Sequence, residues 1–549
     1  VTRVYYLNVT DGPINANGLD FSQGKLFNGT FPGPLIGACW GDTVIIHVRN
    51  HLQYNGTSIH WHGLRQWQTM HMDGVNGLTQ CPIALGSEFM YNWTAMQYGS
   101  SWYHSHYSVQ YADGLQAPIT IHGPTSYPYD IAIEPITITD WANNSAFQNI
   151  APIRGGRADT MDVLLNGTGD ITRFTGGQTK NTDTIPPRFE LSFDDAAPNP
   201  MTGAKRYLLR LINTSFGNSF IFAIDNHTLT VVETDFVPVH NFNTTSILVA
   251  IGQRYNIIVE ATPIVNVLLP PPVLSPRTSF YHVDQNAYMK TGVLRYDKTS
   301  TTDPTTIGWN ISDTDSDKSI NDQLNPVLQW SVQKPANWDN SPEVFNIVQT
   351  NGEGQYATAF VAFQRNGSTD VNPFQTTYGN PTFLNLDNVS QECDEWPAGW
   401  FVVPENYTDN DWIFLVIDKP KLGPHPIHLH GHDFAIIQQS DNSSFDIKKF
   451  NQNQPDVNFP RRVWLMHCHI AGHASGGLSL QIMERHKAAN GIWPPGNSDA
   501  LNEAHKLCAS WNSWSYDCKN LWPGNTGNSQ KAEYPSCEDS TNVQNDSGV

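Results

Sequence analysis

Four pairs of histidines, each separated by a single residue, have the clearest chemical meaning in this sequence. The pairs are His60/His62, His104/His106, His428/His430 and His467/His469. The chain has 20 histidines in 549 residues, and random placement would give only about 0.7 such pairs by counting matches to the spacing. On a strand, residues i and i+2 face the same side, so each pair can direct two imidazoles at one place. Imidazoles gathered in this way can hold a multinuclear centre of Cu, Zn, Fe or Ni.

Cys468, between His467 and His469, narrows the choice of metal. In an extended backbone its thiol points away from both neighbours, so a thiolate there can bind one metal while the flanking imidazoles bind others. One cysteine and two histidines are the ligand set of a blue-copper electron-transfer centre. Leu478 stands ten residues later, where a weak axial ligand is expected, and it cannot coordinate. The absent donor favours Cu(I) and predicts a raised reduction potential.

Short strand-length runs separated by turns are the elements that would position these side chains. They lie at 43–50, 118–122, 207–212, 255–260 and 412–417. Such runs at this spacing predict an all-β protein built of sandwiches or barrels. Helical periodicity is local, around 501–508, and the stretches 123–128 and 298–322 are typical of connectors.

The bulk composition limits domain number, location and partners. The chain is too long for one core, which stops growing at roughly 250–300 residues, so we expect three domains. A net charge of −20 disfavours nucleic acid and anionic membranes as partners, and no apolar run approaches the ~18 residues of a membrane span. The chain starts at Val1 without a leader and carries many Asn-x-Ser/Thr sites, so we expect a mature, secreted, extracellular protein with N-linked glycans.

Four longer motifs around the histidines resemble the copper signatures of multicopper oxidases. They are His60-Trp61-His62-Gly63, Trp102-Tyr103-His104-Ser105-His106, His425-Pro426-Ile427-His428-Leu429-His430-Gly431-His432 and His467-Cys468-His469-Ile470-Ala471-Gly472-His473. The similarity extends over nearly the whole chain and is greatest to laccases of the ascomycete type. It implies three cupredoxin-like Greek-key β-barrel or sandwich domains, which we place at 1–124, 125–300 and 301–549. The middle domain would hold no copper and would help to form the substrate pocket.

The resemblance also implies four copper ions. A type 1 ion would bind to His425, Cys468 and His473, and a type 2 ion to His60 and His428. A type 3 pair would use the remaining six imidazoles, His62, His104, His106, His430, His467 and His469. The implied activity is that of a laccase: phenols give single electrons to the type 1 copper, and the electrons pass through Cys468 and its neighbours to reduce O2 to two waters.

Three carboxylates are candidates for proton transfer. Asp73 resembles the family acid beside the trinuclear cluster, although an Asp-Gly turn on the surface explains the same residues. Glu233 and Asp235 fall where fungal laccases keep a carboxylate for the phenol hydroxyl, and we favour Asp235; solvated acids at a strand end are the alternative. His432 exceeds the implied ligand set, and we expect it to support its loop.

The seven cysteines and the C-terminus add further expectations. The resemblance implies a Cys81–Cys508 disulfide, and Cys39 is expected to be a buried free thiol. Pairing among Cys393, Cys518 and Cys537 stays open. The last four residues, Asp546, Ser547, Gly548 and Val549, resemble the processed tail that plugs a solvent channel in ascomycete laccases, and a frayed tail is the alternative.

One departure from the family lies before the last motif. Relatives carry a strand and an Asp-Asn-Pro-Gly turn there, whereas Arg462 leads directly into Val463. Losing a core strand would leave backbone groups unpaired, so we expect the sequence to be incomplete at this point.

Other functions share part of this pattern. Ferroxidases and ascorbate oxidases have the same layout, but the latter usually place Met where Leu478 stands. A non-catalytic copper-binding protein has no need of the link through Cys468. We expect a monomer, and the physiological phenol stays open.

Overall fold

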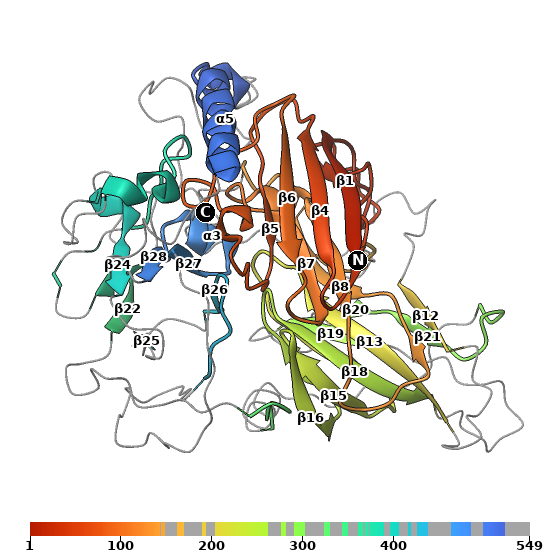
Figure 1. Cartoon of the computed structure of the whole chain (residues 1–549). Helices are drawn as coiled ribbons and strands as arrows, with labels where there is room; N and C mark the ends of the chain where they lie inside the picture. The colour runs from red at the N-terminus through yellow and green to blue at the C-terminus, as the bar shows by residue number, and fades with distance from the viewer. Residues whose placement is uncertain are drawn as a thin grey trace, which may run out of the picture.

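The computed structural model describes most of the first half of the chain and separate segments of the second half. The described residues are 1–142, 144–148, 162–169, 189–193, 204–261, 276–280, 290–301, 323–329, 343–349, 361–365, 368–369, 371, 373–388, 396–405, 415–418, 425–436, 463–484 and 498–521. Three β-rich units follow one another along the chain, with the second below the first and the third beside it in Figure 1. The expected all-β fold is confirmed.

The first unit is a sandwich of two four-stranded sheets. One has the order β2-β1-β4-β6 and the other the order β3-β8-β7-β5. The strands are β1 (Thr2–Asp11), β2 (Lys25–Phe27), β3 (Ile36–Cys39), β4 (Thr43–Asn50), β5 (Ile59–Trp61), β6 (Glu88–Thr94), β7 (Gly99–Ser105) and β8 (Gln116–His122). Alternate residues of β4, such as Val44, Ile46 and Val48, are buried in the core. The period of two seen in the sequence therefore reports which face of the strand lies inside.

The second unit has a seven-stranded sheet and a four-stranded one around a common core. The larger sheet contains β9 (Ile131–Ala132), β10 (Ile136–Trp141), β11 (Asp162–Leu165), β13 (Lys205–Asn213), β15 (Leu229–Thr234), β16 (Val237–Thr244) and β18 (Arg254–Ala261). The smaller sheet contains β14 (Phe220–Ile224), β17 (Ile247–Val249), β19 (Pro276–Phe280) and β20 (Lys290–Thr291), and β12 (Glu190–Ser192) pairs with β21 (Val293–Arg295). The predicted strands at 207–212 and 255–260 are confirmed as β13 and β18.

The third unit contributes two more sheets, with orders β23-β22-β25 and β24-β28-β27-β26. Their strands are β22 (Glu343–Gln349), β23 (Val361–Arg365), β24 (Val402–Glu405), β25 (Leu415–Asp418), β26 (Ile427–Leu429), β27 (Val463–Cys468) and β28 (Ser479–Glu484). The helices among the described residues are η1 (Met70–Met72), η2 (Gln110–Asp113), η6 (Thr382–Asn388), η8 (Ala398–Trp400), α3 (Ala471–Ser475), α5 (Ser498–Ser515) and η11 (Cys518–Asn520). The segment before the third unit still contacts the second, because Val239 of β16 forms an isolated bridge with Pro326.

Strand register brings the histidine pairs side by side. In the first unit β5 is antiparallel to β7, and His60 lies opposite His104. In the third unit β26 is antiparallel to β27, and His428 lies opposite His467. The first two histidine motifs are thus joined within one sheet of the first unit, and the last two within one sheet of the third unit.

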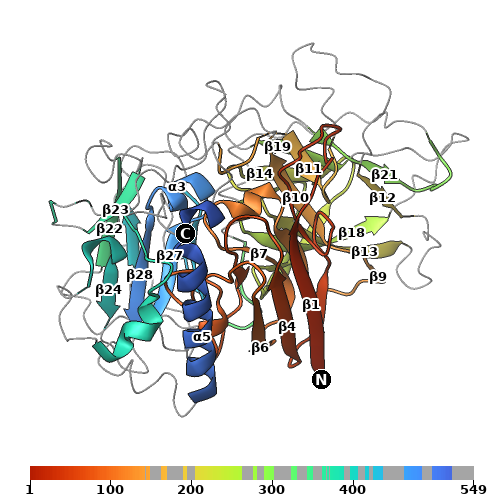
Figure 2. The same ribbon diagram turned by 90° about the horizontal axis from the view of Figure 1, so that it is seen from above.

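Helix α5 comes late in the sequence but packs on the first unit, beside whose strands it runs in Figures 1 and 2. Leu507 and Trp511 of the helix enter the core of that unit. Cys508 forms a disulfide with Cys81, 427 residues away, as the resemblance implied. The expected helical periodicity around 501–508 is also confirmed.

Removing this disulfide is expected to lower the free energy of unfolding by about 2–5 kcal/mol, because the cross-link restricts the unfolded chain. The Cys81→Ser/Cys508→Ser double variant leaves no unpaired thiol, and urea unfolding measures the change. Cys39→Ser is the control, since Cys39 forms no disulfide. Equal midpoints for the double variant and the wild type would contradict this role.

Two sequence-based expectations need correction. Cys39 is free but exposed rather than buried, because it follows buried Ala38 at the end of β3 and alternation turns it outward. The glycosylation motifs at Asn55 and Asn213 are buried, at 3% and 0% exposure. The Asn213 amide donates hydrogen bonds to backbone carbonyls, so it is not open to a glycan.

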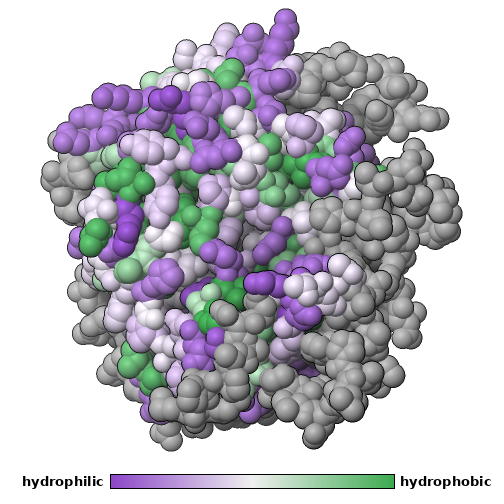
Figure 3. Space-filling view, turned by 90° about the vertical axis from the view of Figure 1, so that its right-hand side faces the viewer, coloured by the Kyte–Doolittle hydropathy of each residue, from purple (hydrophilic) through white to green (hydrophobic). Residues whose placement is uncertain are grey.

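Several expectations lie outside the described residues. They concern Cys393, the side chain of Cys518, Cys537, the C-terminal residues 546–549 and the junction of Arg462 with Val463. Within the described part of the chain, no helix is long and apolar enough to cross a bilayer. The face in Figure 3 carries apolar residues mainly in small separate patches among polar ones, which is ordinary for a protein surface.

Candidate metal centres

A sulfur and two imidazole nitrogens converge at the end of β27. The Cys468 Sγ lies 3.5 Å from His425 Nδ1 and 3.8 Å from His473 Nδ1, and the two nitrogens are 3.3 Å apart. Cys468 ends the strand, His473 lies in α3 and His425 precedes β26. Cys468 is buried, whereas both imidazoles are partly exposed. This donor set fits a blue copper with its histidines toward the solvent.

Leu478 lies beside this donor set and offers it no ligand atom from its side chain. It is fully buried in the same apolar cluster as Cys468, and its carbonyl accepts a 3.0 Å hydrogen bond from the Cys468 amide. Burial raises the pKa of the Cys468 thiol to about 12. A thiolate at this site therefore requires a bound cation, because the apolar surroundings disfavour the charge.

The four histidine pairs come together between the first and third units. The ligand atoms form three groups, each with all atoms within 4.8 Å of one another: His60, His62 and His428; His62, His104 and His469; His106, His430 and His467. Every group combines residues from both ends of the sequence. Within the described residues, the second unit contributes none of these imidazoles.

The hydrogen bonds of these imidazoles leave bare nitrogens facing one another. His430 donates from Nδ1 to Asp73 Oδ2 at 2.9 Å, and His467 donates from Nδ1 to the Cys468 carbonyl at 2.9 Å. In the neutral rings both Nε2 atoms then carry lone pairs, yet they lie only 3.2 Å apart. Two lone pairs at this distance repel unless a cation lies between them. The arrangement therefore fits a metal.

The same holds for the remaining imidazoles. His60 donates from Nδ1 to the Asp73 carbonyl at 2.8 Å, and its Nε2 faces His428 Nε2 at 3.4 Å. His104 Nε2, His62 Nδ1 and both nitrogens of His469 are buried without a hydrogen-bond partner. Buried polar atoms are rarely left unpaired, so these nitrogens fit the role of metal ligands. Neutral imidazole is a suitable ligand for copper.

Asp73 is the carboxylate that holds this arrangement. It is fully buried, its carbonyl orients His60 and its Oδ2 orients His430. It thereby connects a ligand of the first unit with one of the third. The surface Asp-Gly turn is not what the structure has at this position. Partners of this kind fix the tautomer and the ring orientation of metal ligands.

Burial keeps eight of the histidines in the ligand sets neutral. Burial, followed by the neighbouring histidines, lowers the pKa of His62, His104, His106, His428, His430 and His469 well below 6.5. Burial lowers the pKa of His467 to about 4, and burial together with His425 lowers that of His473 to about 3. Four carboxylates shift the other way: burial raises the pKa of Glu233 to about 7 and those of Asp113 and Asp140 to about 6, and it raises the pKa of Asp235 above its usual value.

These shifts predict that acid destabilises the metal-free protein. Below about pH 6.5 the imidazoles bind protons in the unfolded chain but not in the folded protein. Protonation therefore favours the unfolded chain, and the free energy of unfolding decreases as the pH falls. The raised pKa values of the carboxylates have the opposite effect on stability, but eight shifted imidazoles outweigh four carboxylates. We expect the thermal midpoint of metal-free protein to rise between about pH 5 and pH 6.5. A midpoint that falls across this interval would contradict the assignment of buried, neutral rings.

Glu233 and Asp235 occupy different surroundings. Glu233 is 6% exposed and accepts hydrogen bonds from the Ser100 amide and the Asn256 side chain. It is thus enclosed between the first and second units. The side chain of Asp235 is 38% exposed and forms a 2.8 Å ion pair with Arg254. Of the two carboxylates, only that of Asp235 is open to solvent.

Two further residues, His432 and Trp102, contact histidines of the ligand groups. His432 donates to the His430 carbonyl and pairs with Glu484 at 3.0 Å, which agrees with support of the loop. Trp102 stacks on His104, with ring centroids 4.1 Å apart. The sequence signal for Trp102 is its place at the start of the second histidine motif, but its role as a support for the ring was not predicted.

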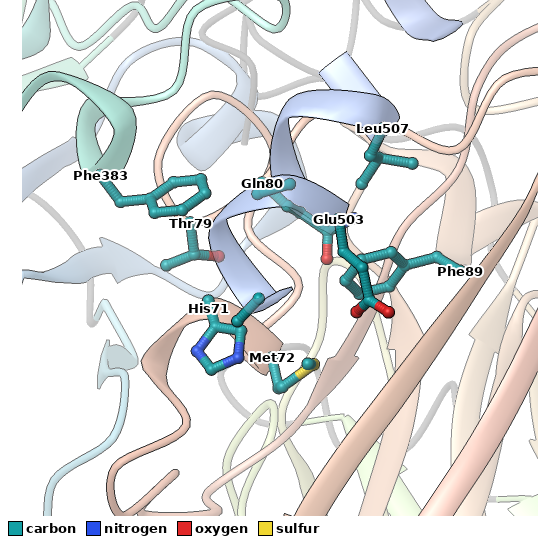
Figure 4. Close-up of a pocket in the computed structure, with 10 residues that line it drawn as sticks. His71, Met72, Thr79, Gln80, Phe89, Phe383, Glu503 and Leu507 are labelled. Carbon is teal, nitrogen blue, oxygen red and sulfur yellow. The ribbon is translucent and has the colours of Figure 1, made fainter. Parts of the chain in front are cut away.

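A small pocket elsewhere holds none of these ligands. It lies between η1, β6, η6 and α5, where His71, Met72, Phe89, Phe383 and Glu503 line it (Figure 4). Its position shows that helix α5 closes the first unit on the side of η1.

Comparisons with known proteins agree with this geometry. Models of the multicopper oxidase family match residues 8–126, 133–299 and 340–461. A laccase of Arthroderma benhamiae is 36% identical, covering 95% of this chain and 83% of its own. Laccase-2 of Botryotinia fuckeliana is 38% identical, covering 94% and 87%. The crystal structure of a laccase from Botrytis aclada superposes with a TM-score of 0.79 at 34% identity, covering 93% and 92%.

Fold and site together define a copper-dependent oxidoreductase with three cupredoxin-like domains. The chain belongs to the multicopper oxidase family.

Proposed function

We propose that this protein is a laccase, which oxidises phenols and related aromatic reductants one electron at a time and reduces O2 to water. Four copper ions supply the redox chemistry. His425, Cys468 and His473 would hold the type 1 ion, and His60 and His428 the type 2 ion. The type 3 pair would bind to the two groups of three, His62/His104/His469 and His106/His430/His467.

The observation that carries this proposal is the position of Cys468 in β27. Its sulfur belongs to one ligand set, while the adjacent His467 and His469 belong to the two groups of three imidazoles. The covalent bonds of three consecutive residues, His467, Cys468 and His469, therefore connect the sulfur's ligand set to the other two sets. A copper-storage protein has no need of such a link, whereas an oxidase requires it to connect the site of electron entry with the site of O2 reduction.

Asp235 is the residue we propose for the phenol hydroxyl. When a phenol loses an electron its hydroxyl becomes strongly acidic, and a nearby carboxylate can accept the proton. Asp235 is partly exposed and held by Arg254, while the Glu233 carboxylate is enclosed. The substrate carboxylate is therefore assigned to Asp235 rather than Glu233.

Asp235→Asn is expected to lower kcat/KM for a phenol by about 100-fold, because the amide cannot accept the proton. Oxidation of ferrocyanide, which releases an electron and no proton, should change little, because the asparagine oxygen can still accept the hydrogen bond from Arg254. Steady-state assays with both reductants measure the contrast. Equal losses with both reductants would mean that the substitution acts through the fold rather than on the substrate.

Substrate choice distinguishes this proposal from the related oxidases. We expect the rate with a methoxyphenol to exceed the rates with Fe²⁺ and ascorbate. A preference for Fe²⁺ would assign the chain to ferroxidases, and a preference for ascorbate to ascorbate oxidases.

Secretion, glycosylation, a monomeric state and the domain limits 1–124, 125–300 and 301–549 are part of the proposal. Asn8, Asn28, Asn226 and Asn243 are exposed in the structure and carry the glycosylation motif. Peptide mapping of secreted protein would be expected to find glycans at such positions and none at Asn55 or Asn213.

A further inference from the structure

The second unit provides no ligand, yet one of its turns touches two imidazoles of the cluster. The turn contains Gly252, with φ of +79°, and a Cβ added there would lie 2.9 Å from His62 Cε1 and 3.3 Å from His469 Cδ2. His62 comes from the first unit and His469 from the third. The backbone of the second unit therefore abuts the His62/His104/His469 group at the junction of the other two units.

Arg254 fixes this turn to the ligand-bearing strands. It is 4% exposed, and its guanidinium donates to the Gly252 carbonyl and to the Ser100 carbonyl of β7, both at 3.2 Å. Strand β7 continues from Ser100 into His104. The guanidinium also lies against Gly63, directly after His62, where a Cβ would come within 2.5 Å of Nη2.

Asp235 completes the arrangement and keeps the guanidinium paired. Its carboxylate contacts Arg254 Nη1 at 2.8 Å and the Arg254 amide at 2.9 Å. The planar guanidinium has several donors in a fixed geometry, so one side chain contacts the Gly252 turn, the strand that leads to His104 and the loop that follows His62. A lysine keeps the charge but cannot make all of these contacts at once.

We propose that Arg254 and the Gly252 turn position the His62/His104/His469 group, so that the middle domain takes part in oxygen reduction without binding copper. This inference rests on the proposed ligand assignment. Neither residue touches the reacting atoms, so both act as positioning residues. Supporting contacts of this kind typically change metal affinity or activity by about 10–100-fold.

Gly252→Ala is the sharpest test, with Gly86→Ala as its matched control. Gly86 has φ of +75° and no atom within 4 Å of an added Cβ, so both variants carry the same backbone strain and only one reaches the imidazoles. We expect Gly252→Ala to lose copper and the near-ultraviolet absorption of the type 3 pair, and to retain the blue absorption per chain. Gly86→Ala should keep all of these signals.

Arginine substitutions provide a second, independent test. Arg254→Met should raise KM for O2 and weaken the same near-ultraviolet absorption, and Arg254→Lys should restore part of the loss. Arg210→Met is the control, because Arg210 is also buried in the second unit but donates to the Ile133 carbonyl.

Equal copper content and near-ultraviolet absorption in Gly252→Ala and Gly86→Ala would overturn the inference, as would equal losses in Arg254→Met and Arg210→Met. If the wild-type chain itself bound no copper beyond the blue ion, the proposed function would fail instead. The two failures are therefore distinguishable.

Discussion

Cys468→Ser is expected to abolish phenol oxidation and the blue absorption together. The serine hydroxyl does not replace a thiolate as a copper ligand, and the position is fully buried, so a water molecule cannot take the place of the missing ligand. The link from the type 1 set to His467 and His469 is lost at the same time. We expect rates at the level of free copper in solution and a loss of one copper per chain, measured by metal analysis and absorption spectroscopy.

Cys39→Ser is the matched control for this prediction, because Cys39 is the other free cysteine that the structure describes. Its substitution should leave copper content, colour and turnover unchanged. Retention of phenol oxidation in Cys468→Ser would show that electrons enter elsewhere, and the assignment of the blue site would be wrong.

Asp73→Asn is expected to lower turnover by about 10–100-fold, the range found when partners of metal-bound histidines are replaced. Asp73 accepts the Nδ1 proton of His430 at 2.9 Å, and an amide can present a donor there instead of an acceptor. The ring would then rotate or lose its fixed tautomer. Because the proposed phenol site at Asp235 is separate from Asp73, kcat should fall more than kcat/KM for the phenol.

Asp113→Asn provides the comparison for Asp73. Asp113 is equally buried, but it accepts from Ser145 and the Ala146 amide and contacts no proposed ligand. We expect Asp113→Asn to alter stability more than turnover. If both variants lost the same turnover per folded molecule, burial of a carboxylate rather than its contact with His430 would explain the effect.

Much of the fold and of the site follows from local patterns in the sequence. Alternation around Val44 and Val48 predicts a half-buried strand because the period of two is set by the backbone itself. The histidine pairs could be interpreted for the same reason, because a spacing of two residues places both rings on one face of a strand. Cys468 between two histidines predicts two linked sites, and the structure brings these residues into adjacent ligand sets.

Features that depend on contacts between distant segments could not be predicted in this way. Nothing near Gly252 indicates that its turn meets His62 and His469, because that contact forms only when three units assemble. Cys39 was expected inside, but its direction depends on where β3 ends. Glu233 and Asp235 are two residues apart and indistinguishable as carboxylates, and only the neighbouring Ser100 and Arg254 separate their roles.

The most direct test of the central claim is the ratio of phenol oxidised to O2 consumed by copper-loaded protein, with peroxide assayed in the same vessel. We predict that O2 uptake depends on a hydroquinone-type phenol, that four electrons from the phenol are used for each O2, and that no peroxide accumulates. Copper binding without uptake, or two electrons per O2 with release of peroxide, would contradict the account of two linked copper centres that reduce O2 to water.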